Sequence, residues 1–207
     1  MIKTLAYISS LSILIPLIVG IFRIRITEVN QIFFLLISIT SIVELLNSVL
    51  SYYQWNNIWL VNSYDIVQVT MVGILFIKYY GMSILWTRFF GITLVILVST
   101  MILVLLNFGF FNLNQMNAVI ASVFTAIISM SILYWLFSSA NRSFARSSIF
   151  WIASGLLIYS CTTVVVYGLA NTMFKMGSNY ILIYTIFQMS INIVTNIIYS
   201  IAFLCRK

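Results

Sequence analysis

Long runs of apolar residues, separated by short polar clusters, extend over the whole chain. A helix needs about 20 predominantly apolar residues to cross a hydrocarbon core of about 30 Å. Seven runs of suitable length are present, at residues 4–22, 29–51, 60–80, 89–107, 117–137, 149–170 and 180–204. They are continuous, whereas the strands of a membrane β-barrel alternate apolar and polar residues in segments of about ten. The pattern predicts an all-α polytopic membrane protein with seven transmembrane helices in a single domain, residues 1–207.

The first run contains Pro16, the only proline of the chain. Lys3 precedes this run as it would in a signal peptide, but the run ends at Arg23 and Arg25 without a small-residue cleavage site. We therefore expect it to remain as the first helix. Because proline has no N–H and its ring clashes with the preceding turn, Pro16 should kink this helix or leave a carbonyl group free.

Composition supports the membrane assignment. Apolar residues make up 63% of the chain and charged residues 6%, with a mean hydropathy of +1.14. Such a chain lacks the polar surface that a soluble globule requires, so the lipid bilayer is its expected partner. The net charge of +7 lies mostly beside span ends, which favours contact with anionic lipid headgroups over nucleic acid. The two cysteines, Cys161 and Cys205, are too isolated for a disulfide framework or a thiolate metal site.

Basic residues divide unequally between the two sides of a seven-span topology. One side has only Lys3 and Lys175, and the gaps after the second and fourth spans have none. The other side has Arg23, Arg25, Lys78, Arg88, Arg142, Arg146, Arg206 and Lys207. Basic residues in short loops mark the cytoplasmic side, so we expect an amino terminus outside and a carboxyl terminus in the cytoplasm, in a bacterial inner membrane.

The gaps on the outer side, residues 52–59 and 108–116, are rich in aromatic and amide side chains and contain no charge. Such residues commonly form an interfacial belt that anchors helix ends, and this is the favoured interpretation. The alternative is a lid over an outward-opening pocket, with Trp55 and Trp59 as its stacking surfaces.

Two of the three acidic residues, Glu44 and Asp65, lie inside apolar runs. Antiparallel second and third spans bring them near one another, with Glu44 at the middle or outer half of the membrane and Asp65 one or two turns below the outer surface. A charged residue at the membrane centre costs about 2.5 to 3.5 kcal/mol, so we expect a functional role for Glu44. The alternative is a neutral, protonated carboxyl group that joins the second, third and seventh helices. For Asp65, a helix cap or an interfacial contact is an equal alternative.

A polar line follows the seventh span. Thr185, Gln188, Asn192, Thr195 and Tyr199 recur at helical spacings of three and four, with Asn196 beside them. Such residues hydrogen-bond neighbouring helices, or they line a space filled by water or a ligand. The candidate site for a ligand or a proton combines both groups of polar residues: Glu44, Asn47, Tyr64, Asp65, Gln68, Tyr184, Gln188 and Asn192.

A short internal match accompanies these candidates. Tyr64-Asp-Ile-Val-Gln-Val69 and Tyr184-Thr-Ile-Phe-Gln-Met189 share Tyr, Ile and Gln, and both enter the membrane from the outer side. Their positions fit a parallel repeat of spans 1–3 and 5–7 joined by the fourth span, a 3+1+3 arrangement.

Three segments resemble a known group of proteins. They are Asn56-Asn-Ile-Trp-Leu-Val-Asn-Ser-Tyr64, Phe150-Trp-Ile-Ala-Ser-Gly-Leu-Leu-Ile-Tyr159 and Asn192-Ile-Val-Thr-Asn-Ile-Ile-Tyr199. With the order of spans, they resemble small, uncharacterised seven-helix bacterial inner-membrane proteins that often accompany two-component signalling genes. The resemblance implies the fold and the membrane more than a function. A signalling partner in the membrane or the cytoplasm is expected if the protein is a receptor, because the chain has no output domain of its own. The group carries a carboxylate four residues after Tyr64, where this chain has Gln68, so Glu44 is the better match to an acidic site.

Several familiar functions of seven-helix proteins lack their residues here. The seventh span has no lysine for a retinal Schiff base, and the chain has no histidine for haem, for catalytic zinc or as the base of a serine or cysteine nucleophile. We therefore expect no enzyme, metal or cofactor. Three functions stay open: a receptor-like sensory or regulatory protein that binds a small or amphipathic ligand and acts through a partner at Arg142 and Arg146, a small proton-linked or facilitative transporter, and an accessory subunit of a membrane complex.

Overall fold

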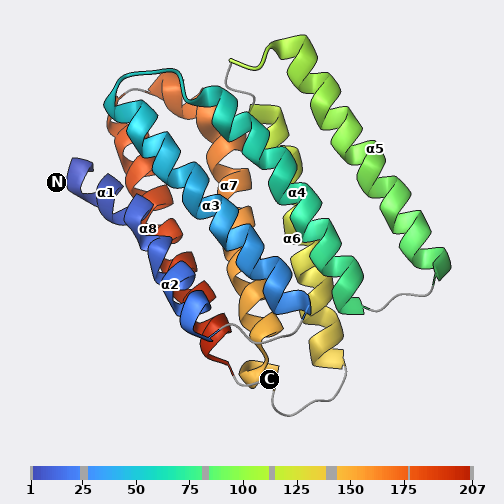
Figure 1. Cartoon of the computed structure of the whole chain (residues 1–207). Helices are drawn as coiled ribbons and strands as arrows, with labels where there is room; N and C mark the ends of the chain where they lie inside the picture. Colours follow the sequence, from blue (N-terminus) through green and yellow to red (C-terminus); the bar gives the residue numbers. More distant parts are fainter. Residues whose placement is uncertain are drawn as a thin grey trace.

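A computed structural model describes residues 2–23, 28–80, 84–111, 115–138, 144–176 and 178–205, and its regular structure in these ranges is entirely helical. The elements are α1 (Ile2–Ser12), α2 (Leu14–Arg23), α3 (Glu28–Tyr52), α4 (Ile58–Tyr80), α5 (Ile84–Phe108), α6 (Gln115–Ser138), the 3₁₀ helix η1 (Phe144–Arg146), α7 (Ser148–Met176) and α8 (Ser178–Leu204) (Figure 1). Within the described ranges, seven stretches of 20 to 25 residues are long and apolar enough to cross a membrane. They confirm the predicted all-α class and its seven spans.

The first span is broken into α1 and α2 at Ile13, three residues before Pro16. Because Pro16 has no N–H, the carbonyl group of Ser12 loses its usual partner four residues along the helix. The next amide, Leu17 N, still donates to the Ile13 carbonyl oxygen at 3.4 Å. The kink predicted from the proline is confirmed.

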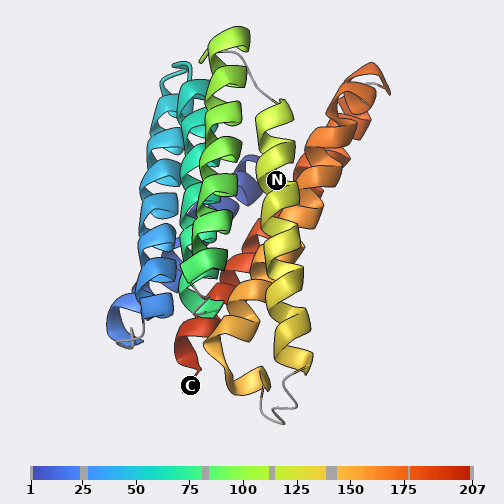
Figure 2. The ribbon, with the colours of Figure 1, turned by 90° about the vertical axis from the view of Figure 1, so that its right-hand side faces the viewer.

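Six spans form a ring. Around it, α3 packs against α4, α4 against α6, α6 against α7, α7 against α8, α8 against α1 and α2, and α2 against α3. The remaining span, α5, lies outside the ring against α4 and α6, as Figures 1 and 2 show. Exposed apolar side chains, among them Leu85, Ile96 and Leu106, cover much of α5. The ring therefore encloses an interior, and α5 takes no part in its wall.

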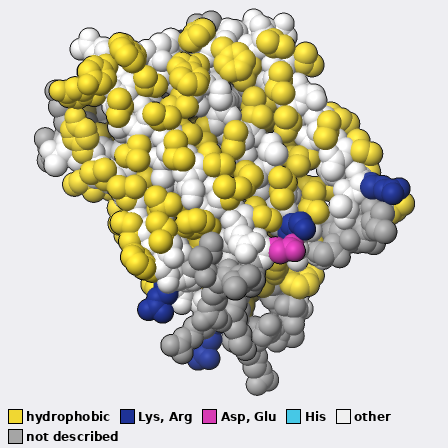
Figure 3. All heavy atoms as spheres, viewed as in Figure 1, with side chains coloured by type: hydrophobic (Ala, Val, Ile, Leu, Met, Phe, Trp, Pro, Cys, Tyr) yellow, Lys and Arg dark blue, Asp and Glu magenta, His cyan; other side chains and the backbone are white. Residues whose placement is uncertain are grey.

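The two ends of the bundle differ in character. We call one the basic end, where α2, α4, α5 and η1 carry Arg23, Lys78, Arg88 and Arg146. In Figure 3 the Lys and Arg side chains lie low on the molecule and at its right edge, and none is visible in the upper part. The opposite, aromatic end contains the loop at residues 53–57 and the turn at residues 109–111. The distribution of basic residues predicted from the sequence is thus a property of the folded bundle.

Apolar side chains fill the half of the interior next to the basic end. Alternating helix directions bring together the first half of α3, the second half of α4 and the first half of α7, represented by Phe33, Leu75 and Ile152. All three are 2% exposed or less. The second halves of α6 and α8 complete this core with Ile132 and Phe203. The basic half of the bundle is therefore tightly packed.

One close approach fixes α7 against α8 in this packed half. The position of a Cβ atom on Gly155 would lie 2.5 Å from the Tyr199 ring, which is closer than any side chain allows. Tyr199 is 7% exposed, and its ring packs edge-to-face on Phe33 with centroids 5.0 Å apart. The absence of a side chain at Gly155 thus lets α8 place an aromatic ring directly on the α7 backbone.

Candidate functional site

Two neighbouring cavities occupy the half of the bundle next to the aromatic end, and a third, smaller cavity extends from them into the apolar core. The α4 cavity lies between α3, α4, α6, α7 and α8, the α1 cavity lies between α1, α3, α7 and α8, and the inner cavity reaches down to Phe33 and Ile37 in the apolar core. The space in them that the centre of a water molecule can occupy is about 170, 240 and 40 Å³, respectively. One water needs about 10 to 15 Å³ by this measure, so each cavity has room for more than one.

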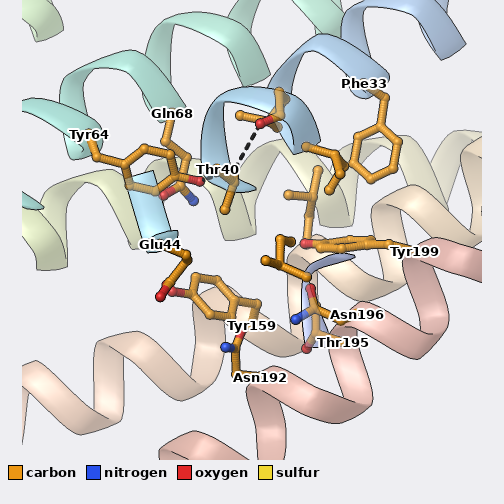
Figure 4. Close-up of a pocket in the computed structure, with 14 residues that line it drawn as sticks. Phe33, Thr40, Glu44, Tyr64, Gln68, Tyr159, Asn192, Thr195, Asn196 and Tyr199 are labelled. Carbon is orange, nitrogen blue, oxygen red and sulfur yellow. Dashed lines mark hydrogen bonds between the residues drawn. The ribbon is translucent and has the colours of Figure 1, made fainter. Parts of the chain in front are cut away.

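Glu44 of α3 and Tyr159 of α7 line all three cavities. In Figure 4 both side chains extend from facing helices into the same space, with Asn192 of α8 below them. Both residues are half-buried. Glu44 therefore lies where the three cavities meet, which is consistent with the weight that the sequence gives it.

Asp65 is more enclosed than the sequence suggests. Its side chain lines the α4 cavity together with Glu44, and it is only 9% exposed. In the described part of the chain it has no hydrogen-bond or ion-pair partner. An interfacial contact is thus not what surrounds Asp65, because α4 turns this residue toward the ring interior. The structure brings the two carboxyl groups to one cavity.

Polar side chains from several helices complete the lining. Tyr64 and Thr40 share a hydrogen bond of 2.7 Å between their hydroxyl oxygens, which joins α4 to α3. Asn47, which lines the α4 and α1 cavities, accepts a hydrogen bond from Asn57 of the loop at the aromatic end. Gln68 is 7% exposed and lines the α4 and inner cavities. The wall of the cavities is therefore tied to the loop above it.

Seven of the eight candidate site residues line at least one of the three cavities: Glu44, Asn47, Tyr64, Asp65, Gln68, Gln188 and Asn192. The eighth, Tyr184, is half-buried on α8 and is not part of these linings. Gln68 and Gln188, the glutamines of the internal match, face the same α4 cavity. The repeat itself stays a prediction.

The polar line on α8 serves two purposes. Toward the aromatic end, Thr185 and Gln188 line cavities. Further along, Asn192 donates to Ser9 Oγ at 3.1 Å, and Asn196 donates to Ser12 Oγ at 2.7 Å, so both bind the broken first span. The line therefore joins neighbouring helices and also borders the cavities, because Asn192 lines the α1 and inner cavities and Asn196 the inner one.

Four further lining residues are not among the eight site candidates. Tyr159, Thr163 and Tyr167 of α7 face the α4 cavity, as does Ser122 of α6. Their spacing of four along α7 was an available signal, since residues four apart share a helix face. The less regular polar residues around them, such as Ser160 and Thr162, obscured it.

Trp55 and Trp59, the two residues of the predicted lid, lie on the outside of the aromatic end. Trp55 is 66% exposed and Trp59 is 39% exposed, and neither lines any of the three cavities. The two loops at this end are joined by amide groups, because Asn62 donates to the Phe110 carbonyl at 2.9 Å and Asn56 donates to the Phe111 carbonyl at 3.4 Å. The lid stays a prediction.

The predicted partner contact is at the basic end. Arg146 is exposed in η1, while Arg142 lies outside the described residues. Trp151, in the first turns of α7, donates its indole N–H to the Ala145 carbonyl oxygen at 2.8 Å. The η1 segment is therefore attached to α7.

The lining is acidic and neutral in character. Its two carboxyl groups, Glu44 and Asp65, are accompanied by amides, hydroxyls and tyrosine rings, and no Lys or Arg lines any of the three cavities. Across the residues that the structure describes, no group of three or more His, Cys, Asp or Glu side chains could hold a metal ion. The arrangement is suited to binding a small polar molecule.

Comparisons with protein-family models, with curated proteins and with solved structures found no match for this chain. The fold and the site define its class directly. The chain is an integral membrane protein, with seven candidate spans in its described residues and a polar cavity system in one half of the bundle.

Proposed function

We propose that the chain is a receptor-like sensory or regulatory membrane protein, which binds a small ligand in the three cavities and acts through a partner. The observation that supports this proposal is the division of the interior. Polar cavities around Glu44 occupy the aromatic half, and buried apolar side chains fill the basic half. A ligand that enters at the aromatic end meets a packed core before it reaches the basic end, which suits detection better than passage.

Helix α7 offers a physical connection from the cavities to the basic end. It runs from Ser148 to Met176, and it carries Tyr159 and Thr163 in the cavity wall. Its first turns carry Phe150 and Trp151, which contact η1 through the Phe144 ring and the Ala145 carbonyl. A helix shifts as a rigid element, so a displacement at the cavity reaches η1.

In the proposed mechanism, a partner in the membrane or the cytoplasm binds differently to the displaced η1 segment. The positive-inside rule puts the basic end in the cytoplasm, so the cavities face the outside of a bacterial inner membrane. Exposed Arg146 in η1 then offers a cationic contact on the cytoplasmic side. The resemblance to proteins that accompany two-component signalling genes favours the same arrangement.

Thiol accessibility tests this function without knowledge of the ligand. Cys161 and Cys205 are first replaced by Ala, and one cysteine is then introduced at Asn47→Cys in the cavity wall or, as a matched control, at Val72→Cys in the packed half, where Val72 is 0% exposed. Sealed vesicles of each orientation are treated with a charged, membrane-impermeant methanethiosulfonate. The receptor predicts that Asn47→Cys reacts from the aromatic side only and that Val72→Cys reacts from neither side.

The other outcomes select other functions. Reaction of Val72→Cys from the basic side indicates alternating access and a transporter, because the packed half must then open. Failure of Asn47→Cys to react from either side indicates a closed, dry interior and leaves the accessory subunit. Either result overturns the receptor.

A further inference from the structure

We propose that the ligand of the α4 cavity is a small organic cation, an amine or a quaternary ammonium compound. This inference rests on the proposed ligand-binding function and adds the chemical class of the ligand. It is carried by the charge, the unpaired polar groups and the aromatic rings of one cavity.

The charge of the α4 cavity has one sign. Of the three acidic residues in the chain, Glu44 and Asp65 line this cavity, and no basic side chain is among its lining residues. The third, Glu28, is instead paired with Lys78 at the basic end, with 3.0 Å between Oε2 and Nζ. The exposed acidic residue therefore has a lysine beside it, whereas the two enclosed carboxyl groups have no basic side chain in their cavity. A cationic ligand supplies the counter-charge that stabilises their ionised forms.

Asp65 and Gln68 provide a second, independent observation. They are 9% and 7% exposed, line the cavity, and make no hydrogen bond with any other side chain or backbone group in the described ranges. Their polar atoms face the cavity, so the molecule that occupies it, water or a ligand, is the hydrogen-bond partner that they require. An ammonium group with N–H donors satisfies both oxygens, and a quaternary ammonium group satisfies the charge of the carboxylate.

Tyrosine rings favour an organic cation over a bare metal ion. Tyr64, Tyr159 and Tyr167 contribute rings to the same cavity wall. The negative face of an aromatic ring attracts ammonium groups, and sites for quaternary ammonium ligands are commonly lined in this way. The Thr40 hydroxyl, 2.7 Å from the Tyr64 hydroxyl, holds the first of these rings in place. Figure 4 shows the adjoining inner cavity, which Tyr64, Tyr159 and Glu44 also line.

The size of the cavity agrees with such a ligand. About 170 Å³ is available to the centres of water molecules, which is far more than one water or one bare ion needs. The adjoining α1 cavity shares Glu44, Asn47 and Gln188 with it and extends the space toward α1. A cation with a short polar or apolar substituent therefore fits, with its charged group near the two carboxyl groups.

A matched pair of probes tests the charge. Choline and its uncharged isostere, 3,3-dimethylbutan-1-ol, differ at one atom, a quaternary nitrogen in place of carbon. Binding of each to the purified full chain is measured by calorimetry in maltoside micelles, which carry neither charge nor choline. A charge-assisted contact contributes about 1.5 to 3 kcal/mol, so we expect choline to bind at least about tenfold more tightly than the isostere and tetramethylammonium to compete with it.

Matched variants test the site. We expect Asp65→Asn and Glu44→Gln each to weaken choline binding at least about tenfold by the same reasoning. Glu28→Gln removes the same charge at the opposite end and should leave the affinity within about twofold. Tyr159→Leu should weaken binding several-fold, while Tyr159→Phe, which keeps the ring, should not. The thermal unfolding midpoint of each variant shows whether it is folded.

The remaining outcomes separate this inference from the function on which it rests. If choline and the isostere bind equally, the proposal of a cationic ligand is wrong, but a ligand site remains. The same holds if Asp65→Asn and Glu28→Gln have equal effects on choline binding. If none of the three probes binds and Asn47→Cys reacts from the aromatic side, only the proposal of a cationic ligand is wrong. Competition by sodium chloride more strongly than by tetramethylammonium indicates an inorganic cation and likewise overturns it. An unreactive Asn47→Cys overturns both proposals.

Discussion

Glu44 on α3 and Asp65 on α4 face one cavity from neighbouring helices, and no cationic side chain lines that cavity with them. Both carboxyl groups are enclosed by the ring of spans. Unpaired ionisable groups inside a membrane protein oppose folding. The two carboxyl groups therefore lower the stability of the protein, although they favour the binding of a cation.

The first prediction follows from that opposition. Replacement by the neutral amide, in Glu44→Gln or Asp65→Asn, should raise the free energy of unfolding by about 1 kcal/mol or more, because the enclosed ionisable group is removed and the shape is kept. The control, Glu28→Gln, loses the exposed pair with Lys78 and should change stability by less than about 0.5 kcal/mol. Unfolding in mixed dodecyl sulfate micelles measures all three. Destabilisation by both cavity variants would show that the carboxyl groups hold helices together.

A second prediction concerns the contact of Gly155 with Tyr199. Gly155→Ala places a methyl group against a buried ring that packs on Phe33, so it should destabilise the protein by about 1 to 3 kcal/mol. Gly168→Ala is the matched control, since it lies on the same helix and nothing approaches its Cβ position within 4 Å. It should change stability by no more than about 0.5 kcal/mol. Equal melting temperatures for the two variants would contradict the close packing of α7 and α8.

The hydrogen bonds between α8 and the first span give a third prediction. Asn196 donates to Ser12 Oγ, and both residues are buried. A double-mutant cycle with Asn196→Ala and Ser12→Ala should yield a coupling energy of about 0.6 kcal/mol, with an upper bound of about 1.7 kcal/mol. Ser190→Ala, on the exposed side of α8 with a bond only to its own helix, should couple to Ser12→Ala by about zero. A coupling energy of zero between Asn196 and Ser12 would mean that their hydrogen bond does not contribute to stability.

The belt interpretation of the aromatic end is the fourth prediction. Trp55 and Trp59 are exposed and do not line the cavities, so Trp55→Ala and Trp59→Ala should change the affinity for choline by less than about twofold. Asn47→Ala, which alters the cavity wall itself, should change it more. Calorimetry under the conditions above measures these affinities. A large loss of affinity in either tryptophan variant would support the lid interpretation.

Orientation is the subject of the fifth prediction. Because short loops rich in Lys and Arg stay in the cytoplasm, a fluorescent protein fused after residue 207 should fluoresce in bacteria, and alkaline phosphatase fused there should be inactive. A phosphatase inserted in the loop at residues 53–57 should be active. The reverse pattern of activities would refute the assigned topology and move the cavities to the cytoplasmic side.

Some features could be predicted well because they depend on local sequence. The break near Pro16 needs only the missing amide hydrogen of one residue, and the spans need only length and hydropathy. The choice of Glu44 as the leading site candidate also followed from sequence, since a carboxyl group in the middle of an apolar run is costly wherever the helix faces.

Other features depended on the neighbours of each helix. Asp65 was expected close to water from its distance to the helix end, yet α4 rotates it toward the α4 cavity. Tyr159 carried no charge, and the irregular polar residues that follow it hid its spacing of four to Thr163 and Tyr167, so it did not stand out from a lipid-facing ring. Asn192 and Asn196 lie on one polar line, but only the position of the broken first span assigned them to Ser9 and Ser12.

The sequence by itself determined the seven spans, the kink and the separation of basic and aromatic ends, because lipid requires every backbone polar group to be satisfied within a helix and repels charge from its core. Only the tertiary structure decided which faces point inward, that α5 stays outside the ring and that two carboxyl groups share a cavity. Lipid and a packed interior are both apolar, so hydropathy cannot distinguish the two faces of a membrane helix, and the contacts between helices must.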